Sequence, residues 1–185
     1  MPRPVTVALT GGIAAGKSEA LAAFARHGAA TASSDEFVHR LLAEDEEVRQ
    51  AIRGRWGEEA VGDRGRIAKI VFDDRAELEW LEQLLHPKTR RLAQEWLGST
   101  GALIEVVEIP LLFETGGESR FDKVVVITAP RDVRESRRAG FADREARLIP
   151  DEEKVARADF AYVNDGTLAE LDAFVAGVVE SLSSS

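Results

Sequence analysis

The decisive stretch is residues 5–18, VTVALTGGIAAGKS, close to the start of the chain. Its first five residues are apolar or β-branched, which predicts a short buried strand that runs into the glycine turn at residues 10–12. The apolar positions of residues 17–26 lie on one stripe at helical spacing, so a helix is expected to follow at once. The turn between them matches the pattern G-x-x-x-x-G-K-[ST] in the strand-to-helix context that this pattern requires.

This pattern predicts a loop that binds phosphate. Its glycines let the backbone approach a ligand closely, so that amide N–H groups and the helix N-terminus point at phosphate oxygens. Lys17 is expected to reach the β- and γ-phosphates of a nucleotide, and the Ser18 hydroxyl is expected to ligate Mg²⁺. The alternative is a glycine-rich turn without a ligand, which the flanking strand and helix disfavour.

The composition of the 185 residues limits the partners. Lys and Arg number 24 against 33 Asp and Glu, which gives a formal charge of −9 and disfavours a protein that coats nucleic acid. Cysteine is absent, which excludes a disulfide scaffold, a thiolate metal site and a cysteine nucleophile. No run reaches the roughly 20 apolar residues that span a bilayer, so we expect a cytoplasmic protein with no membrane partner.

Four further apolar segments predict strands at residues 29–34, 103–107, 123–127 and 160–163. Helical patterns separate these segments, and this alternation predicts an α/β fold with a parallel sheet flanked by helices. Residues 48–96 are mostly helical in pattern, so they are expected to form an insertion between the early and the later strands. Breaks in this helical stretch are expected at Gly54, Gly57, Gly62, Gly65 and Pro87.

Two acidic residues follow predicted strands. Asp35 is either a carboxylate that accepts the proton of an acceptor hydroxyl or part of a helix N-cap formed by Ser34 or Asp35. Glu108 comes at the carboxyl end of an inner strand, where ligand crevices of parallel sheets lie, and could act through water bound to magnesium. Its alternative role is that of a turn residue beside Pro110.

Two basic features stand out against the acidic background. His86 precedes Pro87 at the expected end of a helix, and a lone histidine is more often structural than catalytic. Arginines are dense between residues 131 and 147, and arginine forms planar, bidentate contacts with phosphate. We expect one or two of them to contact a ligand, while the others form helix ion pairs with nearby acids.

Taken together, five segments of the chain resemble dephospho-coenzyme A kinases in their order and spacing. They are the loop, Asp35, Leu85–Pro87, Glu108–Glu114 and Pro150–Lys154. The resemblance extends from about Val5 to Leu171. It implies an enzyme that transfers the γ-phosphoryl of ATP to the ribose 3′-hydroxyl of dephospho-coenzyme A, the last step of coenzyme A synthesis.

The resemblance also implies an architecture. The P-loop three-layer fold of nucleoside monophosphate kinases would form a single domain over residues 1–185. A helical insertion at about residues 37–96 would receive the coenzyme, and a lid at about residues 134–154 would close over ATP. The pattern leaves the oligomeric state open.

By matched position, the resemblance assigns roles to single residues. The catalytic group would comprise Lys17, Asp35 and Arg138, while Asp35, His86 and Glu108 would contact the substrate. The nucleotide would be bound by Gly12, Ala14, Ala15, Gly16, Lys17, Ser18 and Glu19, with Ser18 on Mg²⁺. Glu19 and Ala14 depart from the family pattern, which carries threonine and glycine there.

Two other functions fit parts of the same pattern. One is a different small-molecule or nucleoside monophosphate kinase, which a panel of acceptors would distinguish. The other is an adenine-nucleotide-binding module without catalysis. A guanine-specific switch is excluded, because Asn164 is the only asparagine and its neighbours do not form an Asn-Lys-x-Asp motif.

Overall fold

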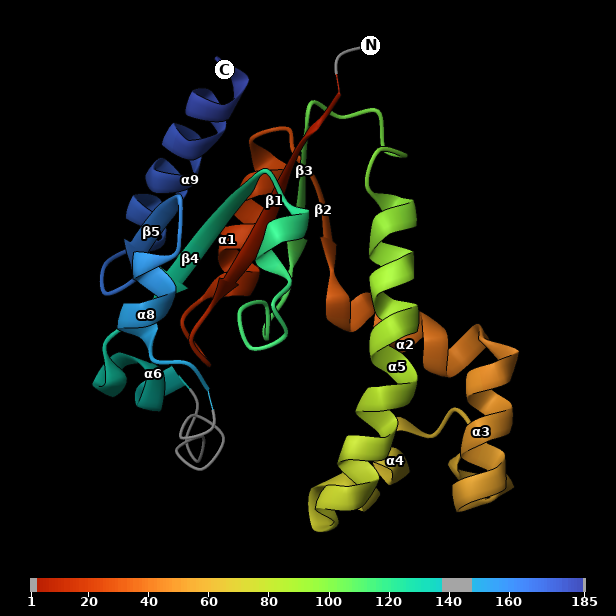
Figure 1. Cartoon of the computed structure of the whole chain (residues 1–185). Coiled ribbons are helices and arrows are strands. Elements are labelled where there is room, and N and C mark those ends of the chain that lie inside the picture. The colour runs from red at the N-terminus through yellow and green to blue at the C-terminus, as the bar shows by residue number, and fades with distance from the viewer. Residues whose placement is uncertain (1–2, 138–147, 185) are drawn as a thin grey trace. The chain divides into compact units, whose positions relative to one another are not determined.

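The computed structural model describes residues 3–137 and 148–184, and all structural statements below concern these residues. The chain divides into two compact units (Figure 1). The core unit comprises Met1–Ser33 and Leu97–Ser185, and the helical unit comprises Ser34–Trp96. Each unit is described by itself. No helix within the described residues combines the length and the apolar character needed to cross a membrane.

In the described part of the core unit, five strands form one parallel sheet in the order β2-β3-β1-β4-β5. The strands are β1 (Val5–Gly11), β2 (Ala30–Ser33), β3 (Ile104–Glu108), β4 (Lys123–Thr128) and β5 (Phe160–Val163). The predicted α/β class with a parallel sheet is therefore confirmed. The four strands predicted after β1 lie within one residue of the observed bounds at each end. Three of them are compact apolar runs, whereas β2 consists of small residues.

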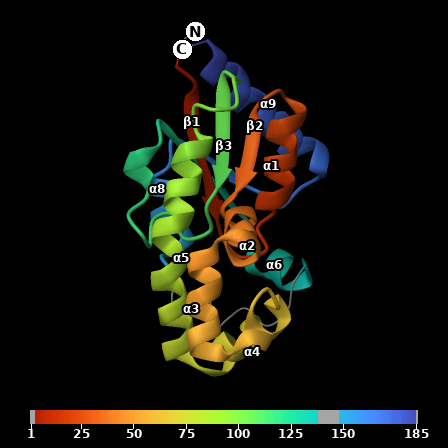
Figure 2. The same ribbon diagram turned by 90° about the vertical axis from the view of Figure 1, so that its right-hand side faces the viewer.

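Helices cover both faces of this sheet. The helices of the core unit are α1 (Lys17–Arg26), α6 (Arg131–Arg137), α8 (Asp151–Ala156) and α9 (Leu168–Ser183). On one face α1 and α9 lie side by side, and α8 lies on the other (Figure 2). Parallel strands that are covered on both faces read as continuous apolar runs, as β1 and β4 do here.

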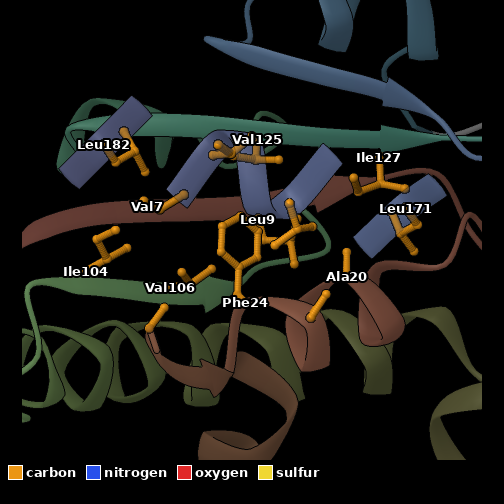
Figure 3. Packing of buried hydrophobic residues seen from close by; sticks show 14 of the residues in the cluster. Val7, Leu9, Ala20, Phe24, Ile104, Val106, Val125, Ile127, Leu171 and Leu182 are labelled. Carbon is orange, nitrogen blue, oxygen red and sulfur yellow. The ribbon is translucent and has the colours of Figure 1, made fainter. Parts of the chain in front are cut away.

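Alternating residues of the central strands fill two cores. Val7 and Leu9 of β1 point to the face that α1 and α9 cover, where they pack with Phe24 and Leu171 (Figure 3). Ala8, between them in sequence, belongs to a smaller cluster on the opposite face with Leu112 and Phe113. These buried contacts fix the position of β1, and therefore of the loop that leaves its carboxyl end.

The helical unit contains α2 (Ser34–Glu44), α3 (Glu46–Trp56), α4 (Arg64–Asp73) and α5 (Arg75–Trp96), with a short 3₁₀ turn at Glu58–Ala60. Its core is a separate cluster centred on Leu41, Ile52, Leu81 and Leu85. This unit covers residues 34–96, and the helical insertion was expected over about 37–96. The expected lid, residues 134–154, includes residues 138–147, which lie outside the described residues.

Three of the five expected helix breaks in this unit are wrong. Gly57 and Gly62 do lie between elements and have positive φ angles of 92° and 77°. Gly54 and Gly65, however, lie inside α3 and α4, and Pro87 lies inside α5. A glycine in a helix costs only about 1 kcal/mol relative to alanine, which packing of an apolar face exceeds.

The expected end of a helix at His86 and Pro87 is likewise wrong, because α5 continues to Trp96. Leu81 and Leu85 anchor the helix in the core just before the proline. The proposed N-cap at Ser34 or Asp35 is also wrong, since α2 begins at Ser34 and both residues lie within its first turn.

Candidate active site

The loop between β1 and α1 needs glycine at two positions. Gly11 has a φ of 144°, and a Cβ there would lie 1.8 Å from the carbonyl oxygen of Ile127 on β4. Gly16 has a φ of 101°, and a Cβ there would lie 2.3 Å from Nδ2 of Asn164. Both glycines of the motif are therefore required by the backbone geometry and by close neighbours.

Ala14, inside the same loop, has a φ of 57° and is the single non-glycine residue with positive φ in the described part of the chain. A left-handed conformation costs an L-residue with a Cβ roughly 1 kcal/mol or more. Strain of this kind concentrates at functional sites, where the surrounding structure enforces it. The loop thus holds Ala14 in a left-handed conformation that glycine would adopt without this cost.

The side chain of Lys17 lies over the loop. Its ammonium donates hydrogen bonds to the carbonyl oxygens of Gly11 at 3.3 Å and Gly12 at 2.8 Å. Lys17 and Ser18 form the first two residues of α1, so the partial positive charge of the helix N-terminus adds to that of the ammonium. This combination creates a local site for an anion in a chain whose net charge is −9.

Two side chains from distant parts of the sequence form hydrogen bonds with carbonyl groups of the loop. Asn164, only 4% exposed, donates from Nδ2 to the carbonyl oxygen of Ala15 at 2.8 Å. Nη1 of Arg137 lies 3.3 Å from the same oxygen and 3.4 Å from that of Ala14. Nη2 of Arg137 donates to the carbonyl oxygen of Asn164 at 3.3 Å, which joins the two supports.

Neither residue was assigned from the sequence to the support of the loop. The resemblance assigns the lid arginine to Arg138, which lies outside the described residues, whereas Arg137 of the same arginine-rich run reaches the loop. The available signal was that Asn164 is the only asparagine of the chain and sits at the carboxyl end of a strand.

Gly12 lies close to two further charged groups. A Cβ built there would lie 3.0 Å from Oδ2 of Asp151 and 3.4 Å from Nη1 of Arg134. Arg134 is buried, and its Nε donates to the carbonyl oxygen of Ala129 at 2.9 Å. The beginning of α8 and the middle of α6 thus approach the same point of the loop.

A buried ion pair anchors α8. Nζ of Lys154, which is only 1% exposed, lies 3.2 Å from Oε1 of Glu114. The same carboxylate oxygen accepts a hydrogen bond from the amide of Ile149 at 3.2 Å. Glu114 therefore joins the segment after β3 both to Ile149, two residues before α8, and to the helix itself.

Glu19, expected at the nucleotide, forms an ion pair along its own helix. Its Oε1 lies 3.3 Å from Nη1 of Arg26, and Nη2 of Arg26 donates to Asp172 of α9 at 2.8 Å. Hydrogen bonds from Arg26, and then from His27, lower the pKa of Asp172. The carboxylate of Glu19 is thus partly neutralised, and its role in nucleotide binding stays a prediction.

Comparison with known proteins decides the family. A family model described as dephospho-CoA kinase matches residues 5–170. The chain belongs to this family. A dephospho-CoA kinase of Mesorhizobium japonicum is 38% identical over 92% of this chain and 95% of its own length. One of Brucella melitensis is 35% identical over 97% and 96% of the two chains.

Solved structures agree with this assignment. The structure of TT1252 from Thermus thermophilus has a TM-score of 0.81 and 32% identity, and covers 98% of this chain and 99% of its own. A dephospho-CoA kinase from Campylobacter jejuni has a TM-score of 0.72 and 28% identity over 97% of both chains. A shikimate kinase from Aquifex aeolicus, at 13% identity and a TM-score of 0.55, shows a shared fold alone.

The other site residues expected from the dephospho-CoA kinase pattern lie in both units. In the core unit Glu108 ends β3 and pairs in register with Leu9 of β1 and Ser33 of β2, so it lies on an inner strand as predicted. In the helical unit Asp35 is exposed in the first turn of α2, and His86 is half-buried in α5. Their catalytic or binding roles stay predictions.

Proposed function

We propose that this chain transfers the γ-phosphoryl group of ATP to the 3′-hydroxyl of the ribose of dephospho-CoA, which yields coenzyme A. The observation that carries this proposal is the family match over residues 5–170, which includes the phosphate-binding geometry of residues 11–18. We also propose that the reaction takes place in the cytoplasm, as the lack of cysteine supports.

The loop would bind the donor. Its amide groups and the ammonium of Lys17 would hold the β- and γ-phosphates, in place of the loop carbonyl groups that Lys17 contacts in the structure. Asn164 and Arg137 would keep the loop in the conformation that binds phosphate. Phosphoryl transfer depends mainly on such positioning and on stabilisation of charge.

Ser18 would take part in holding Mg²⁺. Its side chain is exposed at the start of α1, directly after Lys17. The described residues contain no group of three or more His, Asp or Glu side chains that could hold a metal. This fits Mg²⁺, which is commonly bound through one or two protein groups together with substrate phosphates. When bound, the ion would neutralise negative charge on the phosphates.

Asp35 would accept the proton of the attacking hydroxyl. The first turn of a helix favours a carboxylate, and the exposed position leaves the group accessible to substrate. Glu108 and His86 would contact the acceptor, which the helical insertion, expected at about residues 37–96, would receive. An arginine of the lid, assigned to Arg138, would stabilise the charge on the transferred group.

A panel of acceptors tests this function. The purified chain is incubated with ATP and Mg²⁺ and with dephospho-CoA, AMP, a nucleoside or shikimate, and ADP release is followed. We expect efficient turnover with dephospho-CoA alone. Phosphorylation of another acceptor in its place would indicate a different small-molecule kinase, and nucleotide binding with no transfer to any acceptor would indicate a binding module.

A further inference from the structure

A pocket of about 560 Å³ lies within the helical unit, outside the residues discussed so far. Its lining comes from one side of α2 and from the start of α4, including His39, Arg40 and Arg64 together with Glu36 and Glu44. Its walls therefore carry two permanently cationic guanidinium groups and one imidazole. Guanidinium groups suit anions with several oxygen atoms, phosphate above all.

The two arginines of the pocket differ from most others in this unit. Neither Arg40 nor Arg64 forms an ion pair or hydrogen bond with any described residue. Six other arginines of the unit each lie within 4.0 Å of a glutamate, namely Arg49, Arg53, Arg55, Arg66, Arg75 and Arg91. Two arginines without an ion-pair partner among the described residues thus line one pocket, together with Glu36 and Glu44, in a chain that has a surplus of acids.

The pocket residues His39 and Arg40 lie about one helical turn from Asp35 along α2. His39 is four residues beyond Asp35, so the two lie on the same side of the helix, about 6 Å apart along its axis. Arg40 follows directly. In dephospho-CoA the ribose 3′-hydroxyl and the 5′-diphosphate are separated only by the C3′, C4′ and C5′ carbon atoms. A ribose whose hydroxyl lies at Asp35 would therefore place its diphosphate at a distance of about one helical turn from Asp35, which is the distance at which His39 and Arg40 lie along α2.

We propose that Arg40 and Arg64, assisted by His39, bind the diphosphate of the acceptor in this pocket. The inference rests on the proposed function, because it takes the acceptor to be dephospho-CoA. Glu36 and Glu44 at the same pocket would disfavour binding of a free polyanion that lacks the nucleoside. The site would thus recognise a nucleoside diphosphate group whose ribose is already held.

The variants Arg40→Gln and Arg64→Gln test this site in the complete enzyme. Each should raise the KM for dephospho-CoA about tenfold, the effect of losing one charge-assisted hydrogen bond, with kcat and the KM for ATP nearly unchanged. Arg90→Gln is the matched control, because Arg90 is also exposed and has no ion pair among the described residues but does not line the pocket.

Competing ligands separate recognition of the diphosphate from a structural role. At saturating ATP, the inhibition constant of ADP-ribose against dephospho-CoA should rise in both variants in parallel with the KM. That of adenosine, which has no phosphate, should not change. An equal rise for adenosine, or an unchanged KM in both variants of an active enzyme, would overturn the inference and leave the proposed function intact. Failure of the wild-type chain to phosphorylate dephospho-CoA would overturn the proposed function itself.

Discussion

Asp35 has an exposed carboxylate in the first turn of α2. If it accepts the proton of the acceptor hydroxyl, Asp35→Asn should lower kcat by about 10²- to 10⁴-fold, the usual contribution of a general base. The KM for ATP should change little, because the proposed donor site is the loop of residues 11–18 rather than Asp35. Steady-state kinetics in both substrates measure this.

Asp35→Glu is the informative companion variant, because it keeps a carboxylate in the first turn of the helix. It should recover part of the turnover that Asp35→Asn loses. A kcat of Asp35→Asn close to that of the wild type would contradict the assignment of Asp35 as the proton acceptor.

Asn164 supports the phosphate-binding loop through one short hydrogen bond to Ala15. Asn164→Ala should destabilise the chain by about 1 to 3 kcal/mol, since it removes a buried partner of a carbonyl group. It should also raise the KM for ATP, because the loop loses a support. Urea titration and donor kinetics measure the two effects.

The control for Asn164 is its neighbour Val163, whose side chain is 52% exposed. Val163→Ala should change neither the stability nor the KM for ATP appreciably. A normal KM for ATP in Asn164→Ala would show that the loop does not depend on this support.

Local residues of the site were predictable from the sequence, whereas remote ones were not. Lys17 and Ser18 belong to a pattern whose spacing is set by a single turn. The contact between Asn164 and Ala15 joins positions 149 residues apart, so no local pattern could specify it. Arg137 presents the same difficulty, because only the path of α6 decides which arginine reaches the loop.

At the scale of elements, α5 contains the least expected feature, a proline in the middle of a long helix. Pro87 is exposed, so replacing it removes little packing. In a helix interior alanine is more stable than proline by about 3 kcal/mol. The unfolded chain also becomes more flexible when proline is replaced, which opposes this stabilisation by about 1 kcal/mol. Pro87→Ala should therefore stabilise the chain by roughly 2 kcal/mol in chemical unfolding. A loss of stability would instead indicate that α5 needs the proline.

A pair of charges joins α3 to α5 and makes stability depend on pH. Asp45 accepts from the amide of Val48 and lies 3.0 Å from Nζ of Lys88. Burial alone would raise the pKa of Asp45, but these hydrogen bonds outweigh it and lower the pKa below its usual value. The stabilisation is thus complete above the unfolded pKa, near 3.9, and is lost as the pH falls through the lower folded pKa.

Asp45→Asn isolates this charge, because asparagine also caps helices well. We expect a loss of about 1 to 2 kcal/mol at pH 7. The difference from the wild type should shrink as the pH falls below about 4, where the carboxylate of the unfolded chain becomes protonated, and should be lost below the lower pKa of the folded protein. Urea unfolding of both proteins across this range measures it, and a difference that does not vary with pH would contradict the role of the charge.

Helices and strands were predictable to the extent that apolar patterns specify them. The compact run at residues 123–127 predicted a strand that the structure extends by one residue, to Thr128. The glycines and the proline of residues 48–96 were misleading, because their cost is local whereas the compensating packing comes from residues far along the chain.

At the scale of the whole molecule, the alternation of strands and helices predicts the class of fold but not the order of its strands. The order β2-β3-β1-β4-β5 places β1 in the centre, although it comes first in the chain. Buried contacts on both faces of β1 determine its central position, and these contacts form only once the sheet has formed. The acidic total charge likewise hides local cationic groups, since Lys17 lies at the loop and Arg40 and Arg64 line the pocket of the helical unit together with Glu36 and Glu44.

The central claim is that this molecule transfers phosphoryl from ATP to one hydroxyl of dephospho-CoA. The most direct measurement is a reaction with ATP labelled in its γ-phosphoryl group, followed by mass spectrometry and phosphorus NMR of the acceptor. The account predicts that one labelled phosphoryl group appears on the ribose 3′-oxygen of dephospho-CoA. Label released only as inorganic phosphate, or transferred to another position, would contradict it.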